Sequence, residues 1–243
     1  MIFNSKEKPN FLLTITKGDF MQKIKKSFLF FISIFFILSV LSCGKSTEVK
    51  PEMTELKYSN GMPKEKGLLL KKDGKEIKMG DWTFWYENGL IKKQCTYTDG
   101  SLNGLYTEFY ENGQKREEGE LVNNEKNGKW IFWKKNGQQD EEIEFTNGKK
   151  NGKYKSWYEN GVQIYEGTYE NDKKHGRWVK WFDNSETEEE GYYVNSLKNG
   201  KWNKWDQSGK LIETVIYDNG RVGSKRTYEQ RGVQGQKNRR GMQ

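Results

Sequence analysis

The 243-residue sequence contains no alanine, one histidine, two cysteines and three prolines. Without alanine, and without apolar residues at a sustained 3.6-residue spacing, the chain has little capacity to form helices. Two cysteines cannot build a disulfide framework, and no cluster of histidines and cysteines offers ligands to a metal ion. The glycines form no phosphate-binding loop. We therefore expect an all-β protein that is not an enzyme and uses no metal or other cofactor.

An excess of charge of one sign is also missing from most of the chain. The net charge is +8, but residues 1–42 carry 6 basic and 2 acidic residues, and residues 221–243 carry 7 and 1. The remaining 29 basic and 31 acidic residues nearly cancel in 43–220. A nucleic-acid partner is therefore not expected for this part of the chain. The C-terminal end is expected to be a solvated, disordered tail, with contact to an acidic polymer as the alternative.

The chain instead has a repeat of 24 residues. Glycine recurs six times at this spacing, and aromatic residues and Asn-Gly pairs recur in the same register. The repeat glycines, which we number as position 0, are Gly80, Gly104, Gly128, Gly152, Gly176 and Gly200. A fixed short period indicates an array in which each unit packs on its neighbours. Such an array favours a binding scaffold over an enzyme.

Each repeat is predicted to be a β-hairpin. Asn-Gly occupies positions 8 and 9 of most repeats, as in Asn160-Gly161, and we expect a type I′ turn with positive φ at both residues. Position n then pairs with position 17 − n. Asp or Asn at position 19 marks a second turn, and no proline follows Pro63. We therefore predict an elongated antiparallel β-meander of six 24-residue hairpin repeats, forming a single-layer twisted sheet.

The pairing predicts one packed aromatic face. All nine tryptophans lie at position 2 or position 5. Position 2 pairs with position 15, where glycine is frequent, and rings that cover cross-strand glycines are a known way to stabilise a sheet. The position-2 row consists of Trp82, Tyr106, Trp130, Tyr154, Trp178 and Trp202.

A second aromatic row has the opposite parity and is predicted to lie on the other face of the sheet. Its expected neighbours at position 14 are mostly carboxylates and amides, so we interpret it as a candidate binding stripe. The alternative is that a bulge turns this row into the core, or that long charged side chains cover it. The position-5 row consists of Trp85, Phe109, Trp133, Trp157, Trp181 and Trp205.

The N-terminal segment reads as a signal peptide. Basic residues after Met21 precede an apolar run over 28–41, which is too short to span a bilayer as a helix. The run ends in Val40-Leu41-Ser42-Cys43, which resembles a bacterial lipobox. The resemblance implies that Cys43 is lipidated and becomes the mature N-terminus. The alternative is a plain membrane helix in which Cys43 is incidental.

These features divide the chain into five parts. They are a signal peptide in 1–42, with Met21 as the alternative start; a lipidated N-terminus and tether in 43–57; a degenerate capping repeat in 58–79; six repeats in 80–223; and a basic disordered tail in 224–243. Two residues inside the repeats attract notice for their chemistry. We interpret His175 as a solvated turn residue and Cys95 as a small buried filler.

The pattern G-x-W/Y-x-x-W/F-Y-x-N-G, followed by Y-x-N-G-x-x-N-G, is similar to the bacterial MORN-variant repeat. The resemblance covers 80–223, and a degenerate unit precedes it near Tyr58. It implies an array of hairpins. Because the family includes proteins labelled as antitoxin components of toxin–antitoxin modules, it also implies a protein-binding role. A looser resemblance to choline-binding cell-wall repeats, which are aromatic hairpins too, implies a small ligand or a glycan.

Together these observations predict a surface-anchored lipoprotein of the bacterial cell envelope, in the outer membrane if the bacterium has two membranes. Its repeats are expected to bind a protein partner, either a toxin-like or an envelope protein. A chain that is exported does not fit an antitoxin that acts in the cytosol. We therefore expect any immunity role to lie outside the cytoplasm. The alternative is an envelope protein that binds a glycan, choline or a lipid headgroup through the position-5 row.

Overall fold

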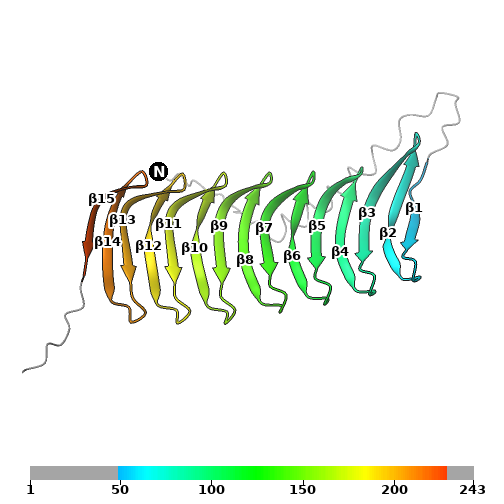
Figure 1. Ribbon diagram of the computed structural model, residues 1–243. Helices are drawn as coiled ribbons and strands as arrows, with labels where there is room; N and C mark the ends of the chain where they lie inside the picture. Colours follow the sequence, from blue (N-terminus) through cyan, green and yellow to red (C-terminus); the bar gives the residue numbers. More distant parts are fainter. Residues whose placement is uncertain (1–48, 229–243) are drawn as a thin grey trace, which may run out of the picture. The chain divides into compact units, whose positions relative to one another are not determined.

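The computed structural model describes residues 49–228, which form one open antiparallel sheet of 15 strands and no helix (Figure 1). The strands follow one another across the sheet in chain order, so each inner strand is hydrogen-bonded to the strands before and after it in the chain. Within this range, the search for an apolar helix of membrane-spanning length found none. The predicted all-β meander of hairpin repeats is confirmed.

Each repeat contributes an odd-numbered strand that ends at position 5 and an even-numbered strand that ends at position 18. The strands are β1 (Glu52–Lys57), β2 (Pro63–Lys72), β3 (Lys75–Trp85), β4 (Ile91–Thr98), β5 (Ser101–Phe109), β6 (Lys115–Val122), β7 (Glu125–Trp133), β8 (Gln139–Thr146), β9 (Lys149–Trp157), β10 (Gln163–Glu170), β11 (Lys173–Trp181), β12 (Thr187–Val194), β13 (Leu197–Trp205), β14 (Leu211–Asp218) and β15 (Arg221–Thr227).

The register within each hairpin follows the prediction up to position 4. In the third repeat, for example, Trp130 at position 2 pairs with Ile143 at position 15. At position 5 the register shifts by one residue, because Trp133 pairs with Gln139 at position 11 and not with position 12. The same shift occurs in the other five repeats. The returning strand therefore carries one extra residue near the turn.

The shift arises because the first turn is a three-residue loop, so our prediction of a type I′ turn there is wrong. The Tyr158 N–H donates to the Val162 carbonyl over 2.8 Å, and the Gly161 N–H donates to the Tyr158 carbonyl over 3.1 Å. Gly161 has a φ of +81°, whereas Asn160 keeps a negative φ. The Asn160 side chain accepts a hydrogen bond from the Val162 N–H (3.0 Å) and so stabilises a loop that ends in a left-handed glycine.

Type I′ geometry occurs instead at the second turn, positions 19 and 20. Asn147 and Gly148, for example, have φ values of 48° and 75°. The twist of such a turn matches that of the strands that it joins. The Gly148 N–H also donates to the Lys126 carbonyl on β7 (2.9 Å), which bonds the turn to the preceding strand pair.

The position-2 row forms the core of the sheet, and its tryptophans lie over glycines. Trp130 is 0% exposed, and a Cβ on Gly119 would clash with its indole. These glycines lie on the strand before the tryptophan, and not on the strand after it as the hairpin pairing suggested. The four pairs are Gly67–Trp82, Gly119–Trp130, Gly167–Trp178 and Gly191–Trp202. In the two repeats with tyrosine at position 2, the preceding strand carries Cys95 or Ile143 instead.

Lysine side chains complete the burial of these tryptophans in a sheet that has only one layer. The Nζ of Lys126 lies 3.9 Å from the centroid of the Trp130 ring and pairs with the Glu117 carboxylate at 2.5 Å. The equivalent lysines over Trp82, Trp178 and Trp202 lie 4.0, 4.2 and 3.9 Å from those ring centroids. Their aliphatic stems exclude water while their charges face the ring electrons, so the lysines act as a second layer.

The strands extend beyond the expected limits of the array at both ends. Glu52–Lys57, which we assigned to the tether, form β1 and pair with β2. Tyr58 follows β1 as Tyr86 follows β3, so the capping hairpin begins earlier than residue 58. At the other end, β15 continues to Thr227, into the segment that we assigned to the tail. The signal peptide, Cys43 and residues 229–243 lie outside the described residues.

Candidate functional site

The position-5 row lies along one rim of the sheet. Each of its residues is the last residue of an odd-numbered strand, from Trp85 at the end of β3 to Trp205 at the end of β13. These strand ends lead into the first turns, which follow the lower edge of the sheet in Figure 1. All six side chains are half-buried, whereas all four tryptophans of the position-2 row are buried.

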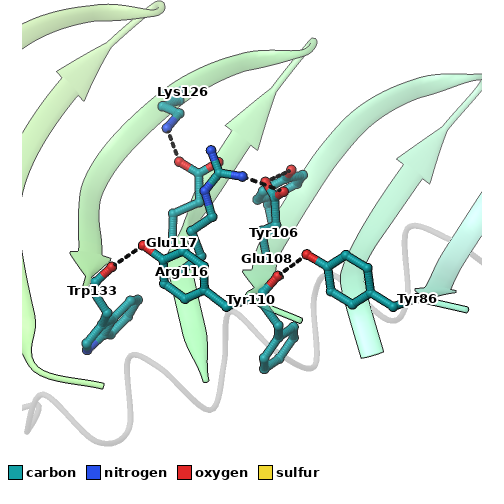
Figure 2. Close-up of polar contacts among 9 residues, drawn as sticks. Tyr86, Tyr106, Glu108, Tyr110, Arg116, Glu117, Lys126 and Trp133 are labelled. Atoms are coloured by element: carbon teal, nitrogen blue, oxygen red, sulfur yellow. Dashed lines mark hydrogen bonds and ion pairs between the residues drawn. The ribbon is translucent and has the colours of Figure 1, made fainter. Parts of the chain in front are cut away.

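Strand alternation places the position-5 row on the face opposite the position-2 row. The ring contacts agree with this separation. Among residues 49–228, every close pair of aromatic rings joins positions 2, 4 and 17, and no ring of the position-5 row takes part. In Figure 2 the Trp133 indole projects away from the Glu117–Lys126 pair that covers the core. A bulge does occur beside the row, but it leaves the row outside the core.

The surroundings of the row include polar side chains. Position 14 alternates with the buried position 15 and therefore shares the face of the row. It carries Gln94, Glu118, Glu142, Glu166, Glu190 and Thr214. One charged side chain covers part of a ring: the Nζ of Lys115 lies 5.5 Å from the Trp133 ring centroid and 2.6 Å from the Glu118 carboxylate. Gln163 similarly donates to Glu166 over 3.1 Å.

The indole N–H groups distinguish the two rows chemically. Each tryptophan of the position-2 row donates to a backbone carbonyl on the preceding strand, as Trp130 does to Glu120 over 3.0 Å. Within the described part of the chain, the five indoles of the position-5 row make no such bond, and none of their nitrogens is a buried atom without a partner. These donors therefore reach solvent. The row offers ring faces, N–H donors and neighbouring carboxylates to a ligand.

A ladder of tyrosine hydroxyls, which the sequence analysis did not assign, fixes the backbone of the position-5 row. The Tyr86 hydroxyl donates to the Phe109 carbonyl over 2.7 Å, and Tyr110 donates to the Trp133 carbonyl over 2.8 Å (Figure 2). Tyr58 and Tyr158 make the equivalent bonds, and Lys134 replaces tyrosine in one repeat. We call these position-6 side chains the tyrosine ladder. It holds each strand end at a fixed distance from the next repeat.

Asparagine at position 8 adds a second link between neighbouring first turns. The Asn160 amide donates to the Asp183 carbonyl over 3.0 Å, while its oxygen holds its own loop. Asn136 is an exception, because its amide donates to Gln138 in the same loop. This double role explains the recurrence of asparagine better than the predicted type I′ geometry does. These links between neighbouring first turns left one signal in the sequence, which is the recurrence of Tyr or Lys at position 6, two residues before Asn.

Cys95 and His175 are the cysteine and the histidine of residues 49–228. Cys95 is buried, and burial raises the pKa of its thiol, which disfavours the nucleophilic thiolate. His175 lies in β11 beside Glu170 at 3.3 Å, and not in a turn as predicted. In the range 49–228, no three His, Cys, Asp or Glu side chains gather where they could hold a metal ion.

A comparison with family models identifies the repeat. The MORN repeat variant matches residues 80–99, 102–123, 150–171 and 198–219. Four segments of the chain match this repeat. Repeats of this type often mediate binding to proteins or membrane lipids, and proteins that carry them are typically non-enzymatic scaffolds. The hairpins at Gly128 and Gly176 lie outside the matched segments but have the same register as the others. A search of curated proteins found no match.

Proposed function

We propose that this MORN-repeat protein is a lipid-anchored binding scaffold of the bacterial cell envelope and not an enzyme. The observation that carries the proposal is the contrast between two rows of the same residue types. In the position-2 row, lysine side chains cover the buried tryptophans. The position-5 row lies along a rim of the sheet, and its indole N–H donors are open to solvent. A repeated row of half-exposed aromatic rings contributes little to core packing and is better suited to contact with a partner.

The anchor is proposed from the lipobox-like Val40-Leu41-Ser42-Cys43. Lipidation of Cys43 would hold the array outside the cytoplasm, in the outer membrane if there are two membranes. Growth with a labelled fatty acid should label the full chain, and Cys43→Ala should abolish the labelling and leave an unprocessed precursor. Unchanged labelling of this variant would contradict the anchor.

A protein partner is one candidate ligand, because repeats of this type often bind proteins. The bacterial MORN-variant resemblance adds a toxin-like protein, with this chain in an immunity role outside the cytoplasm. The nearly balanced charge of residues 43–220 gives no support to a nucleic-acid partner. The second candidate is an envelope glycan, which one specific observation favours: the row repeats at an even interval set by the hairpins.

The binding surface is tested by photo-crosslinking in intact cells. A crosslinking residue that replaces Trp157 should form adducts with an envelope component. The control replaces Lys204, which is exposed on the opposite face. Equal adducts at both sites, or none at residue 157, would refute the position-5 row as the binding surface.

A further inference from the structure

We propose that the position-5 row binds a neutral, extended β-1,4-linked polysaccharide strand, with one aromatic ring for each disaccharide. This inference rests on the proposed function, because it takes the position-5 row as the binding surface, and it names the class of ligand.

The first argument is the spacing of the rings. Successive members of the row are separated by two strands, or about 10 Å at ~4.8 Å for each strand. The six rings occupy the same register in their hairpins, so the interval is constant along the rim. In an extended β-1,4-linked chain, successive sugars are turned over, so the same sugar face recurs once in each disaccharide, at nearly the same interval. A strand laid along the rim would therefore present an equivalent face to every ring.

The second argument is the chemistry of the row. The C–H groups on one face of a pyranose ring carry partial positive charge and stack on the negative face of an aromatic ring. The hydroxyl groups at the edge of the sugar need polar partners of both kinds. Carboxylates at position 14, such as Glu166 and Glu190, accept hydrogen bonds, while Gln163 and the open indole N–H groups donate them. A ring with a polar border repeats in most of the hairpins.

The third argument is charge complementarity. Four of the six position-14 residues are glutamates. Lys115 pairs with Glu118 at 2.6 Å, Lys129 with Glu142 at 2.8 Å and Arg177 with Glu190 at 2.9 Å, so three of these four carboxylates are already partly neutralised. Because most of its carboxylates are paired with cations, the border carries little net charge and favours a ligand without net charge. An anionic polymer would gain no net attraction from these three ion pairs and would still meet the carboxylate of Glu166.

A protein ligand fits the interval less well. Side chains on one face of a β-strand recur about every 7 Å, which does not match the rings. A helix with a heptad pattern recurs about every 10.5 Å, but its seam is apolar and seeks an apolar groove. The row is bordered by carboxylates and amides instead. A heptad helix is therefore the competing ligand that the experiment must separate from a glycan.

The test uses the purified full-length protein and isothermal titration calorimetry with chito-oligosaccharides of two, four and six sugars. Each added disaccharide engages one more ring, so affinity should rise by about fivefold or more at each step. Maltohexaose, whose α-linked chain curves, should bind more weakly than the β-linked hexamer. Trp157→Ala and Trp181→Ala should each weaken binding of the hexamer by at least about fivefold.

The matched control is Tyr192→Ala. Tyr192 is 54% exposed and lies at position 16 on the same face, but outside the row, so binding should be unchanged in this variant. The assignment is overturned if the hexamer does not bind, if affinity is independent of length or linkage, or if the tryptophan variants bind like the parent. If residue 157 crosslinks to a protein while the hexamer does not bind, the glycan assignment fails and the scaffold function stands. If neither is seen, both fail.

Discussion

Trp130 and Trp133 lie three residues apart on β7 and meet opposite surroundings. Trp130 donates its N–H to Glu120, lies over Gly119 and is covered by Lys126. Trp133 ends the strand, keeps its N–H open to solvent and has the Nζ of Lys115 5.5 Å from its ring centroid. The same contrast recurs along the array. A tryptophan in this sheet belongs to the core when a glycine lies beneath it and a lysine above it, and it stays half-exposed when no glycine lies beneath it.

The largest expected effect is on stability, when Trp130 and Trp133 are replaced one at a time by alanine. Trp130→Ala removes a fully buried indole and should lower the free energy of unfolding by about 3–5 kcal/mol. Trp133→Ala removes a half-buried ring and should cost roughly 1–2 kcal/mol. Urea denaturation of the full chain measures both values. Equal losses would mean that the two rows are equivalent and would remove the proposed site.

The next effect tests the glycine beneath the buried ring. Gly119→Ile places a side chain where the Trp130 indole lies and should destabilise the protein by about 1–3 kcal/mol. Where the natural chain has a larger residue, Cys95 or Ile143, the facing ring is a tyrosine. Adding Trp130→Tyr to Gly119→Ile should therefore recover part of the loss.

A double-mutant cycle measures this coupling between residues 119 and 130. Strictly additive losses in the cycle would show that the ring size does not depend on the residue beneath it, and the pairing rule inferred from the six repeats would be wrong. A positive coupling confined to this pair, and absent between Gly119→Ile and a change at Trp133, would sharpen the contrast between the two faces.

Much of the architecture was predictable, and the reason lies in local signals. The 24-residue period and the alternation of aromatic residues predict the strands, their order and the separation of the two rows. The hairpin pairing of Trp130 with Ile143 could also be predicted, because both lie within one repeat. The contact of Trp130 with Gly119 was not predicted. Gly119 and Trp130 lie on two strands that are joined by a second turn, and a bulge at the repeat glycine shifts their register. The pairing within one hairpin does not predict the size of this bulge.

One overlooked sequence signal could have revealed this contact. Gly119–Trp130, Gly167–Trp178 and Gly191–Trp202 are all separated by 11 residues, and Tyr106 and Tyr154 follow Cys95 and Ile143 by the same interval. The tyrosine ladder was harder to find, because its acceptors are backbone carbonyls, which have no signature in the sequence. The candidate stripe was predictable as a row, whereas its open N–H groups required the structure.

The titration of buried tyrosines offers a third test, confined to the core face. Burial raises the pKa of Tyr97 and that of Tyr193 to about 12, against 10.0 for an ordinary tyrosine. The folded state therefore holds these protons more tightly than the unfolded state does. Their contribution to stability is complete below pH 10 and is lost as the pH rises toward 12. Urea midpoints should be constant from pH 8 to 9 and fall from pH 10 to 12.

The control for this pH dependence is the Tyr97→Phe, Tyr193→Phe double variant, whose midpoint should fall less steeply than that of the parent over the same range. An identical fall in both proteins would assign the alkaline instability to groups outside the core face. The position-5 row contains no tyrosine. Glycan binding should therefore decrease only as the protein unfolds at high pH and should show no titration step of its own.

The smallest expected effect concerns the one place where the tyrosine ladder is interrupted. Phe182 occupies position 6 of the fifth repeat and has no hydroxyl to offer to the Trp205 carbonyl, whereas Tyr158 donates to the Trp181 carbonyl over 3.0 Å. Phe182→Tyr should restore the missing bond and raise the free energy of unfolding by about 1 kcal/mol, while Tyr158→Phe should lower it by a similar amount. Because the ladder sets the distance between neighbouring rings, Phe182→Tyr should also strengthen hexasaccharide binding slightly, and Tyr158→Phe should weaken it. If both variants leave stability and binding unchanged, the hydroxyl–carbonyl hydrogen bonds do not stabilise the strand ends and do not hold the position-5 row in place.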